Sequence, residues 1–171
     1  MTGSKKRYVS TSFWDDPWIQ SLDPSQKFLY LYLITNPLTN IAGIYEVTMR
    51  RICFDTGYNE DTVRGIMAVF AEADKAHYRD GWICIPRFTR HQKIAPENNV
   101  RKGIDRILLD LPDAVWRWSI DCGYEYAYLQ NIHSSRRDLK GLLNSDSDSD
   151  LDNNSDSDVS LKGLREAVGI E

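Results

Sequence analysis

Apolar residues after Asp23-Pro24-Ser25-Gln26 repeat with the period of an α-helix. Asp can cap a helix N-terminus, Pro fits the first helical position, and Gln three residues beyond the cap can bond back to it. The helix should end near Asn36, because Pro37 disfavours helical geometry in the residue before it. Its broad apolar face, which predicts a core helix, consists of Phe28, Leu29, Tyr32 and Leu33.

Two further helical patterns lie close together, over 49–56 and 60–74. Thr48 and Asn59 can cap these helices, and Gly57 can adopt the left-handed conformation that ends the first one. Two helices joined by a short turn containing glycine have the dimensions of a helix-turn-helix. The residues predicted to face inward are Met49, Ile52, Cys53, Val63, Ile66, Met67 and Phe70.

A hairpin is predicted over 75–86, Lys-Ala-His-Tyr-Arg-Asp-Gly-Trp-Ile-Cys-Ile-Pro. Asp80-Gly81 favours a two-residue type I′ turn. This turn fixes a register that pairs Arg79 with Trp82, Tyr78 with Ile83, His77 with Cys84 and Ala76 with Ile85. The apolar face of Ala76, Tyr78, Ile83 and Ile85 should then pack on the helices.

The order of these elements predicts the fold class. A short strand is expected over 43–46, before the helix-turn-helix, and the order helix, strand, helix, turn, helix, hairpin is that of a winged helix. We therefore predict an α+β winged helix-turn-helix, mostly helical with a small antiparallel β-wing, over about residues 8–112.

A fourth helix is predicted over 100–111, with Asn99 as its cap. Its buried stripe consists of Val100, Ile104, Leu108 and Leu111. Residues 113–133 are rich in apolar and aromatic side chains and should pack back on the body, so that the folded domain covers 1–133.

Composition adds bounds to this prediction. The chain has 171 residues, of which 42% are hydrophobic and 27% are charged, as in a single soluble domain with an appendage. No apolar run approaches the ~18–20 residues of a membrane span, and the N-terminus lacks the apolar stretch of a signal peptide. Cys53, Cys84 and Cys122 are odd in number and far apart in sequence, which fits a reducing cytoplasm better than a disulfide framework.

The net charge of −4 is unevenly distributed. Residues 144–171 hold eight acidic and two basic residues, whereas residues 1–143 hold 17 acidic and 19 basic ones. We predict a disordered Ser/Asp-rich linker over 134–160 and a short amphipathic segment over 161–171. The acidic tail either competes with nucleic acid for the basic body or serves as a solubilising spacer.

Motifs for catalysis and cofactor binding are missing from the sequence. It contains neither G-x-x-x-x-G-K-[ST] nor G-x-G-x-x-G, the signatures of nucleotide-phosphate binding. His77, His91 and His133 form no pair with metal-ligand spacing, and the cysteines lack the C-x-x-C spacing of zinc sites. We therefore expect a protein that is not an enzyme and has no catalytic residues, metal site or cofactor.

Basic residues mark the predicted contact surface for double-stranded DNA. Their side chains would bind phosphates, which gives salt-dependent and mostly sequence-independent affinity. The candidate DNA-binding residues are Arg50, Arg51, Arg64, Lys75, Arg79, Arg87, Arg90, Lys93, Arg101 and Lys102.

The second helix of the helix-turn-helix weakens this interpretation. Arg64 is the one good base reader in the N-terminal half of its outward face, and Asp61 and Glu72 on that face would repel phosphates. The alternative is a protein-interaction module that binds or inhibits a replication or regulatory partner without binding DNA.

Two local side-chain pairs have simpler interpretations than a binding site. Trp14 and Trp18 are expected to anchor the N-terminal arm on the core rather than to stack on bases. His77 and Cys84, opposite each other in the predicted hairpin, lack a third metal ligand nearby.

Several blocks resemble the N-terminal domain of phage and prophage replication proteins, which include replisome organisers and relatives of DnaD-type primosome proteins. The blocks are Phe13-Trp-Asp-Asp-Pro-Trp-Ile19, Leu33-Ile-Thr-Asn-Pro-Leu-Thr-Asn-Ile-Ala-Gly-Ile-Tyr45, Asp80-Gly-Trp-Ile83 and Arg90-His-Gln92. The resemblance covers about residues 6–112. It implies a winged-helix domain that acts in the initiation or regulation of phage DNA replication, in the cytoplasm of a bacterial host cell, in contact with DNA or replication proteins. After the linker only about a dozen residues follow, so the resemblance does not extend to a second, helicase-loading domain.

Overall fold

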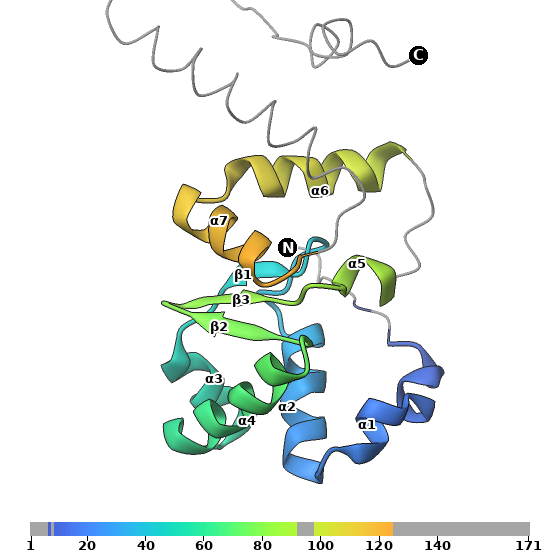
Figure 1. Ribbon diagram of the computed structural model, residues 1–171, viewed down its shortest axis with the longest axis vertical. Coiled ribbons are helices and arrows are strands. Elements are labelled where there is room, and N and C mark those ends of the chain that lie inside the picture. The colour runs from blue at the N-terminus through green and yellow to red at the C-terminus, as the bar shows by residue number, and fades with distance from the viewer. Residues whose placement is uncertain (1–6, 8, 92–97, 125–171) are drawn as a thin grey trace, which may run out of the picture. The chain divides into compact units, whose positions relative to one another are not determined.

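The computed structural model describes residue 7 and residues 9–91 and 98–124, all of which belong to the compact unit Met1–Arg136. This part of the chain is α+β, mostly helical with a small three-stranded antiparallel sheet (Figure 1). The helices are η1 (Thr11–Asp15, a 3₁₀ turn), α1 (Pro17–Ser21), α2 (Pro24–Thr35), α3 (Met49–Thr56), α4 (Glu60–Glu72), α5 (Phe88–His91), α6 (Asn98–Asp110) and α7 (Asp113–Asp121). The strands are β1 (Ile44–Glu46), β2 (His77–Arg79) and β3 (Trp82–Cys84), in the order β1-β3-β2.

Helix α2 begins with the predicted capping box. The Asp23 carboxylate accepts from the Gln26 backbone N–H at 2.9 Å, and the Gln26 side chain accepts from the Asp23 N–H at 3.0 Å. The buried face of α2 differs from the predicted one: Leu29 and Leu33 are buried with Tyr30, whereas Phe28 is 45% exposed. Tyr30 is covered because Phe13, Trp18 and Phe70 surround its ring.

Helices α3 and α4 confirm the predicted caps. The Thr48 hydroxyl accepts from the Arg51 N–H at 3.2 Å, and the Asn59 side chain accepts from the Thr62 N–H at 2.8 Å. Gly57 ends α3 with a φ of 76°, in the left-handed region. Helix α4 ends at Glu72, two residues before the predicted end, and its four predicted core residues are buried.

The hairpin has three of the four predicted pairs; Ala76 and Ile85 lie beyond the strands and instead donate their backbone N–H groups to Phe70 and Gly43. Arg79 pairs with Trp82, Tyr78 with Ile83 and His77 with Cys84. Asp80 and Gly81 both have positive φ, 49° and 85°, as a type I′ turn requires. The predicted strand at residues 43–46 is β1, which pairs antiparallel with β3.

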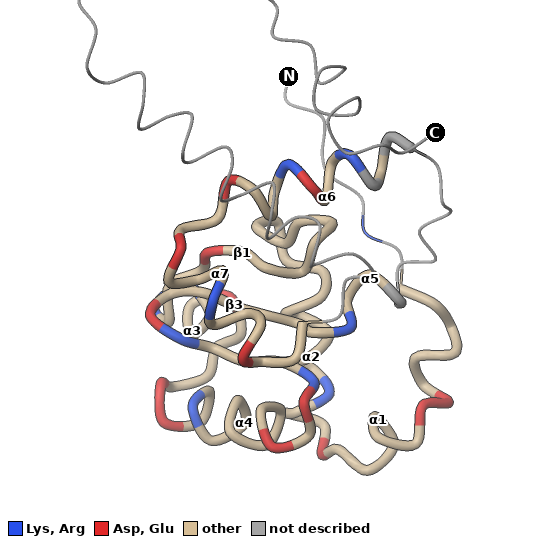
Figure 2. Tube along the Cα trace, turned by 45° about the horizontal axis from the view of Figure 1, so that its top comes forward, with Lys and Arg blue, Asp and Glu red and all other residues tan. Residues whose placement is uncertain are grey.

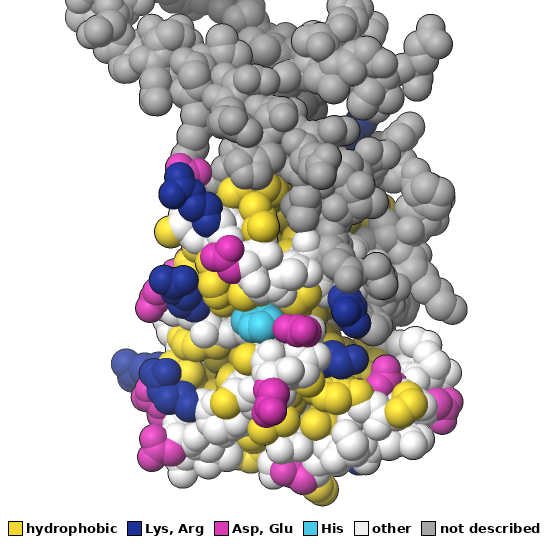
Figure 3. Space-filling model, viewed as in Figure 1, with side chains coloured by type: hydrophobic (Ala, Val, Ile, Leu, Met, Phe, Trp, Pro, Cys, Tyr) yellow, Lys and Arg dark blue, Asp and Glu magenta, His cyan; other side chains and the backbone are white. Residues whose placement is uncertain are grey.

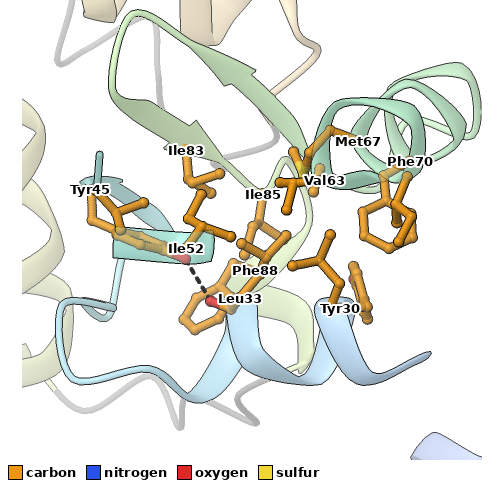
Figure 4. Packing of buried hydrophobic residues seen from close by; sticks show 14 of the residues in the cluster. Tyr30, Leu33, Tyr45, Ile52, Val63, Met67, Phe70, Ile83, Ile85 and Phe88 are labelled. Atoms are coloured by element: carbon orange, nitrogen blue, oxygen red, sulfur yellow. Dashed lines mark hydrogen bonds between the residues drawn. The ribbon is translucent and has the colours of Figure 1, made fainter. Parts of the chain in front are cut away.

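The sheet has a hydrophobic core on each face, with α2, α3 and α4 on one side and α6 and α7 on the other (Figure 1). We name the core beside α3, the turn at 57–59 and α4 the helix-turn-helix core, after these elements. It contains Tyr45 and Ile83 from the sheet, and Figure 4 shows these side chains pointing toward Leu33 and Ile52. The C-terminal core contains the strand residues that point the opposite way, Ile44 and Cys84, with residues of α6 and α7. Alternation along each strand therefore supplies both cores.

The predicted helix over 100–111 is α6, with Ile104, Leu108 and Leu111 buried and Val100 half-buried. Helix α7 packs against it through Val115 and Trp116, as expected for the segment after residue 112. Residues 125–133 and the predicted boundaries at 133 and 160 lie outside the described residues.

Buried tyrosines link distant segments in both cores. In the helix-turn-helix core the Tyr45 hydroxyl donates to the Leu33 carbonyl at 2.6 Å and accepts from the Asn36 amide at 2.9 Å, and burial raises the pKa of Tyr45 to about 12. In the C-terminal core the Tyr124 hydroxyl donates to the Ala42 carbonyl at 2.6 Å. Ala42 and Tyr45 are thus each held in a different core, and between them the chain passes through Gly43, whose φ is 75°.

Candidate nucleic-acid interface

The exposed edge of α4 lies beside the hairpin. Arg64 projects from the first half of α4, and hydrogen bonding to Glu60 raises its pKa, with a smaller contribution from Tyr78 of β2. Helix α4 packs against β2 of the hairpin. The hairpin turn is open to solvent, because the side chains of Arg79 and Asp80 are 63% and 87% exposed. Arg64 and Arg79 thus lie on neighbouring elements.

Three of the predicted DNA-binding arginines are paired with carboxylates of their own or an adjoining turn. Arg51 Nε donates to Asp55 at 2.7 Å, and Arg64 donates to Glu60 through two nitrogens at 2.6 and 2.8 Å. Arg79 Nε lies 3.5 Å from Oδ2 of Asp80, the next residue in the chain. Sequence reasoning missed these pairs, although Arg51–Asp55 and Glu60–Arg64 have the i,i+4 spacing that predicts them.

The remaining predicted residues are spread over several elements. The Lys75 ammonium lies 4.8 Å from the centre of the Trp18 ring, which gives it a structural partner. Lys102 is exposed on α6, on the opposite side of the sheet from α3 and α4 (Figure 1), and Arg50 and Arg87 are exposed on α3 and just before α5. The Arg90 and Arg101 side chains and all of Lys93 lie outside the described residues.

Charge is distributed differently over the two parts of the helix-turn-helix surface. Residues 59–86, which form α4 and the hairpin, hold three basic and five acidic residues. Residues 24–35 and 48–58, which form α2 and α3 with its flanking residues, hold Lys27, Arg50 and Arg51 against Asp55. Figure 2 shows the two signs mixed along the trace, and Figure 3 shows acidic side chains beside several basic ones. The α2–α3 part therefore has the more favourable charge for a polyanion.

Exposed aromatic residues accompany the basic residues of α3. Phe54 is 83% exposed, the most exposed large hydrophobic residue of the described chain. At the end of α3 the rings of Phe28 and Tyr58 meet edge to face, 6.0 Å apart. Sequence reasoning missed Phe54. The pattern that could have revealed it is its position on the outward side of the predicted helix, close to Arg50 and Arg51.

The two tryptophans of the N-terminal arm have different roles. Trp18 packs on Tyr30 and Phe70, with ring centres 4.8 and 5.6 Å away, and is the predicted anchor. The same prediction for Trp14 is wrong, because its side chain is 57% exposed and its ring contacts Phe13 at the edge of the core.

Chemical groups near the hairpin do not form a metal site. Among the described residues no three His, Cys, Asp or Glu side chains gather closely enough to hold a metal ion. His77 faces Cys84 across the strands, and its Nε2 lies 3.9 Å from an Asp74 oxygen.

The Cys84 thiol interacts with Cys122 of the C-terminal core, and this contact and burial raise the pKa of Cys84. The two cysteines are thus neighbours in space, which their separation in the sequence did not suggest.

Comparisons with known proteins identify no relative. No family model, no curated protein and no solved structure matches the chain. Within the described part of the chain, no helix has the length and apolar character needed to cross a membrane.

Proposed function

We propose that the chain is a winged-helix protein that binds double-stranded DNA and acts in the initiation or regulation of phage-type DNA replication. The observation that carries this proposal is the arrangement of α3, a turn containing Gly57, α4 and an adjacent hairpin. The replication role rests on the resemblance of several sequence blocks to phage replication proteins.

DNA contact in this proposal is made mainly through phosphates. The exposed arginines are Arg50, Arg51, Arg64 and Arg79. Arg51, Arg64 and Arg79 each pair with a nearby carboxylate, and ion pairs at the protein surface are weak. A phosphate can therefore replace a carboxylate at low cost. Because α4 presents mostly acidic and small residues outward, we expect little sequence preference.

Titration of a labelled duplex of about 20 base pairs at several salt concentrations tests the proposal. Four phosphate contacts predict a slope of log affinity against log salt of roughly −3.6, and about a hundredfold loss of affinity between ~50 and ~200 mM salt. Absence of binding at ~50 mM salt would contradict duplex binding.

Glu60 provides a sharper test, because it competes with phosphate for Arg64. Glu60→Gln should raise duplex affinity severalfold at low salt, and this gain should shrink as salt increases. Asp110→Asn removes the same charge from the exposed end of α6, on the other side of the sheet, and is the matched control. An equal gain in both variants would show that net charge alone is responsible.

A second candidate function is a protein-interaction module that engages a replication or regulatory partner through α4. The exposed side of α4 is uncharged at Gly65, Ala68 and Val69, and Val69 is 38% exposed, which suits a protein surface better than phosphates. Failure to bind duplex, together with loss of a copurifying replication protein on Val69→Asp, would favour this function.

A further inference from the structure

Phe54 occupies an unusual position for a large apolar residue. Helix α3 is capped at both ends, by Thr48 and Gly57, and Met49 and Ile52 bury its inward face. Phe54 projects from the opposite side with 83% of its surface exposed, so it contributes little to the core. A rigid helix therefore presents a phenyl ring to solvent.

Cations lie on the same side of the helix as this ring. Arg50 and Arg51 precede Phe54 by four and three residues, a spacing that places side chains next to one another on a helix surface. Arg51 bonds to Asp55, and no ion pair of the described residues involves Arg50. The outward side of α3 thus combines an aromatic ring with a cation, Arg50, that pairs with no carboxylate of the described residues.

A second aromatic pair extends this surface toward α2. The Tyr32 hydroxyl donates to the Asp55 carboxylate at 2.8 Å, which ties α2 to the last turn of α3. Phe28, one turn before Tyr32, meets Tyr58 just beyond that turn. Phe28 is 45% exposed and Tyr58 is half-buried, so aromatic groups surround the C-terminal end of α3.

We propose that this surface, formed by Arg50, Arg51, Phe54, Phe28 and Tyr58, binds single-stranded DNA. A cationic surface with exposed rings suits single strands, because unpaired bases stack on aromatic side chains while arginines contact the phosphates. Base faces inside a duplex are covered by their neighbours, and the grooves offer only base edges. Basic residues outnumber acidic ones on α2 and α3, whereas acidic residues outnumber basic ones on α4 and the hairpin. This difference in net charge favours binding of a polyanion at α2 and α3.

This inference deepens the proposed function and rests on it in taking DNA as the ligand. Its distinguishing residue is Phe54, which has no part in the proposed phosphate contacts to duplex. The two ideas can therefore fail separately.

Fluorescence anisotropy with labelled dT12 and with the duplex, at ~50 mM salt, tests the inference in the full chain. Phe54→Ala should weaken dT12 binding about tenfold, within the range for losing one stacked base, and leave duplex binding unchanged. Phe54→Trp should restore dT12 affinity, because the larger ring also stacks. Arg50→Ala should reduce the salt slope for dT12 by about 0.7, the value for one phosphate contact to a single strand.

Ile120→Ala is the matched control, because Ile120 is also exposed but lies on α7, on the other side of the sheet. It should bind dT12 like the wild type, and circular dichroism should show every variant folded, since the substituted side chains are exposed. Equal dT12 affinity of Phe54→Ala and wild type would overturn the inference, as would wild-type protein that binds duplex but not dT12. Binding of dT12 that depends on Phe54, without duplex binding, would support the inference and contradict the duplex function.

Discussion

The two faces of the sheet differ in how their cores are assembled. The helix-turn-helix core draws its buried residues from positions 19 to 88, mostly from helices with clear caps and periodicity. The C-terminal core combines α6 and α7 with Ala42, Ile44 and Cys84 from much earlier in the chain. This second core contains strand residues of the outer face of the sheet, so the proposed contact of the hairpin with DNA is limited to its turn. The comparison shows that the C-terminal helices are part of the same folded body as the helix-turn-helix.

The largest effect is expected from a charge placed in the helix-turn-helix core. Leu33 is fully buried, and Leu33→Asp puts a carboxyl group where no partner compensates for its lost hydration. The cost is comparable with the ~5–15 kcal/mol that stabilises a typical domain, so we expect the variant not to fold. Far-UV circular dichroism and thermal unfolding will measure this. A melting curve like that of the wild type would place the core elsewhere.

A smaller effect is expected at the point where the chain passes between the two cores. A Cβ atom at Gly43 would lie 2.3 Å from the Cβ of Phe88, and φ there is 75°. Gly43→Ala should therefore destabilise the fold by about 3 kcal/mol or more, through both overpacking and backbone strain. Gly57 has a φ of 76° and open space around it, so Gly57→Ala should cost only about 1 kcal/mol. Equal midpoints of urea unfolding for the two variants would contradict the role of Phe88.

The buried tyrosines permit a direct comparison of the cores. Tyr45→Phe removes two hydrogen bonds from the helix-turn-helix core, whereas Tyr124→Phe removes the bond to Ala42 from the C-terminal core. We expect losses of about 2 and about 1 kcal/mol, respectively, in urea unfolding. If each variant shows one cooperative transition, the two cores unfold together. Separate transitions in Tyr124→Phe would instead show that α6 and α7 detach first.

The smallest effect concerns pH. Burial lowers the pKa of His77, and nearby Asp74 only partly opposes this shift. The unfolded chain therefore binds a proton more readily than the folded one, so stability should fall as pH decreases below about 6.5, the ordinary pKa of histidine. Urea midpoints at pH 7.5 and 5.5 measure this effect. His77→Gln should show a smaller difference between the two pH values, and an unchanged difference would assign the pH dependence to other groups.

Local signals predicted most of the helix-turn-helix side of the molecule. Asp23, Thr48 and Asn59 have side chains that satisfy helix N-termini, and Asp80-Gly81 fixes the hairpin register through its backbone conformation. These effects act over a few residues, so the sequence reveals them without knowledge of the tertiary structure.

Features that depend on distant contacts were not predictable in this way. Periodicity placed Phe28 in the core, but three rings from other segments cover Tyr30 instead. The contact between Cys84 and Cys122 depends on where α7 packs. The candidate site was predicted only in part: Arg50 and Arg51 were candidate residues and are exposed, whereas the aromatic surface around Phe54 emerged from the structure.

The hydrogen bond from Tyr124 to Ala42 has a consequence for the order of folding. It joins residues 82 positions apart, whereas the bond from Tyr45 to Leu33 spans 12 positions. The entropic free-energy cost of closing the longer loop is greater by about 1.7 kcal/mol. Long-range contacts of this kind therefore form more slowly. During synthesis, residues up to 91 leave the ribosome before α6 and α7 do, and they already contain the whole helix-turn-helix core. We expect this core to form first, with the outer face of the sheet exposed until the C-terminal helices cover it.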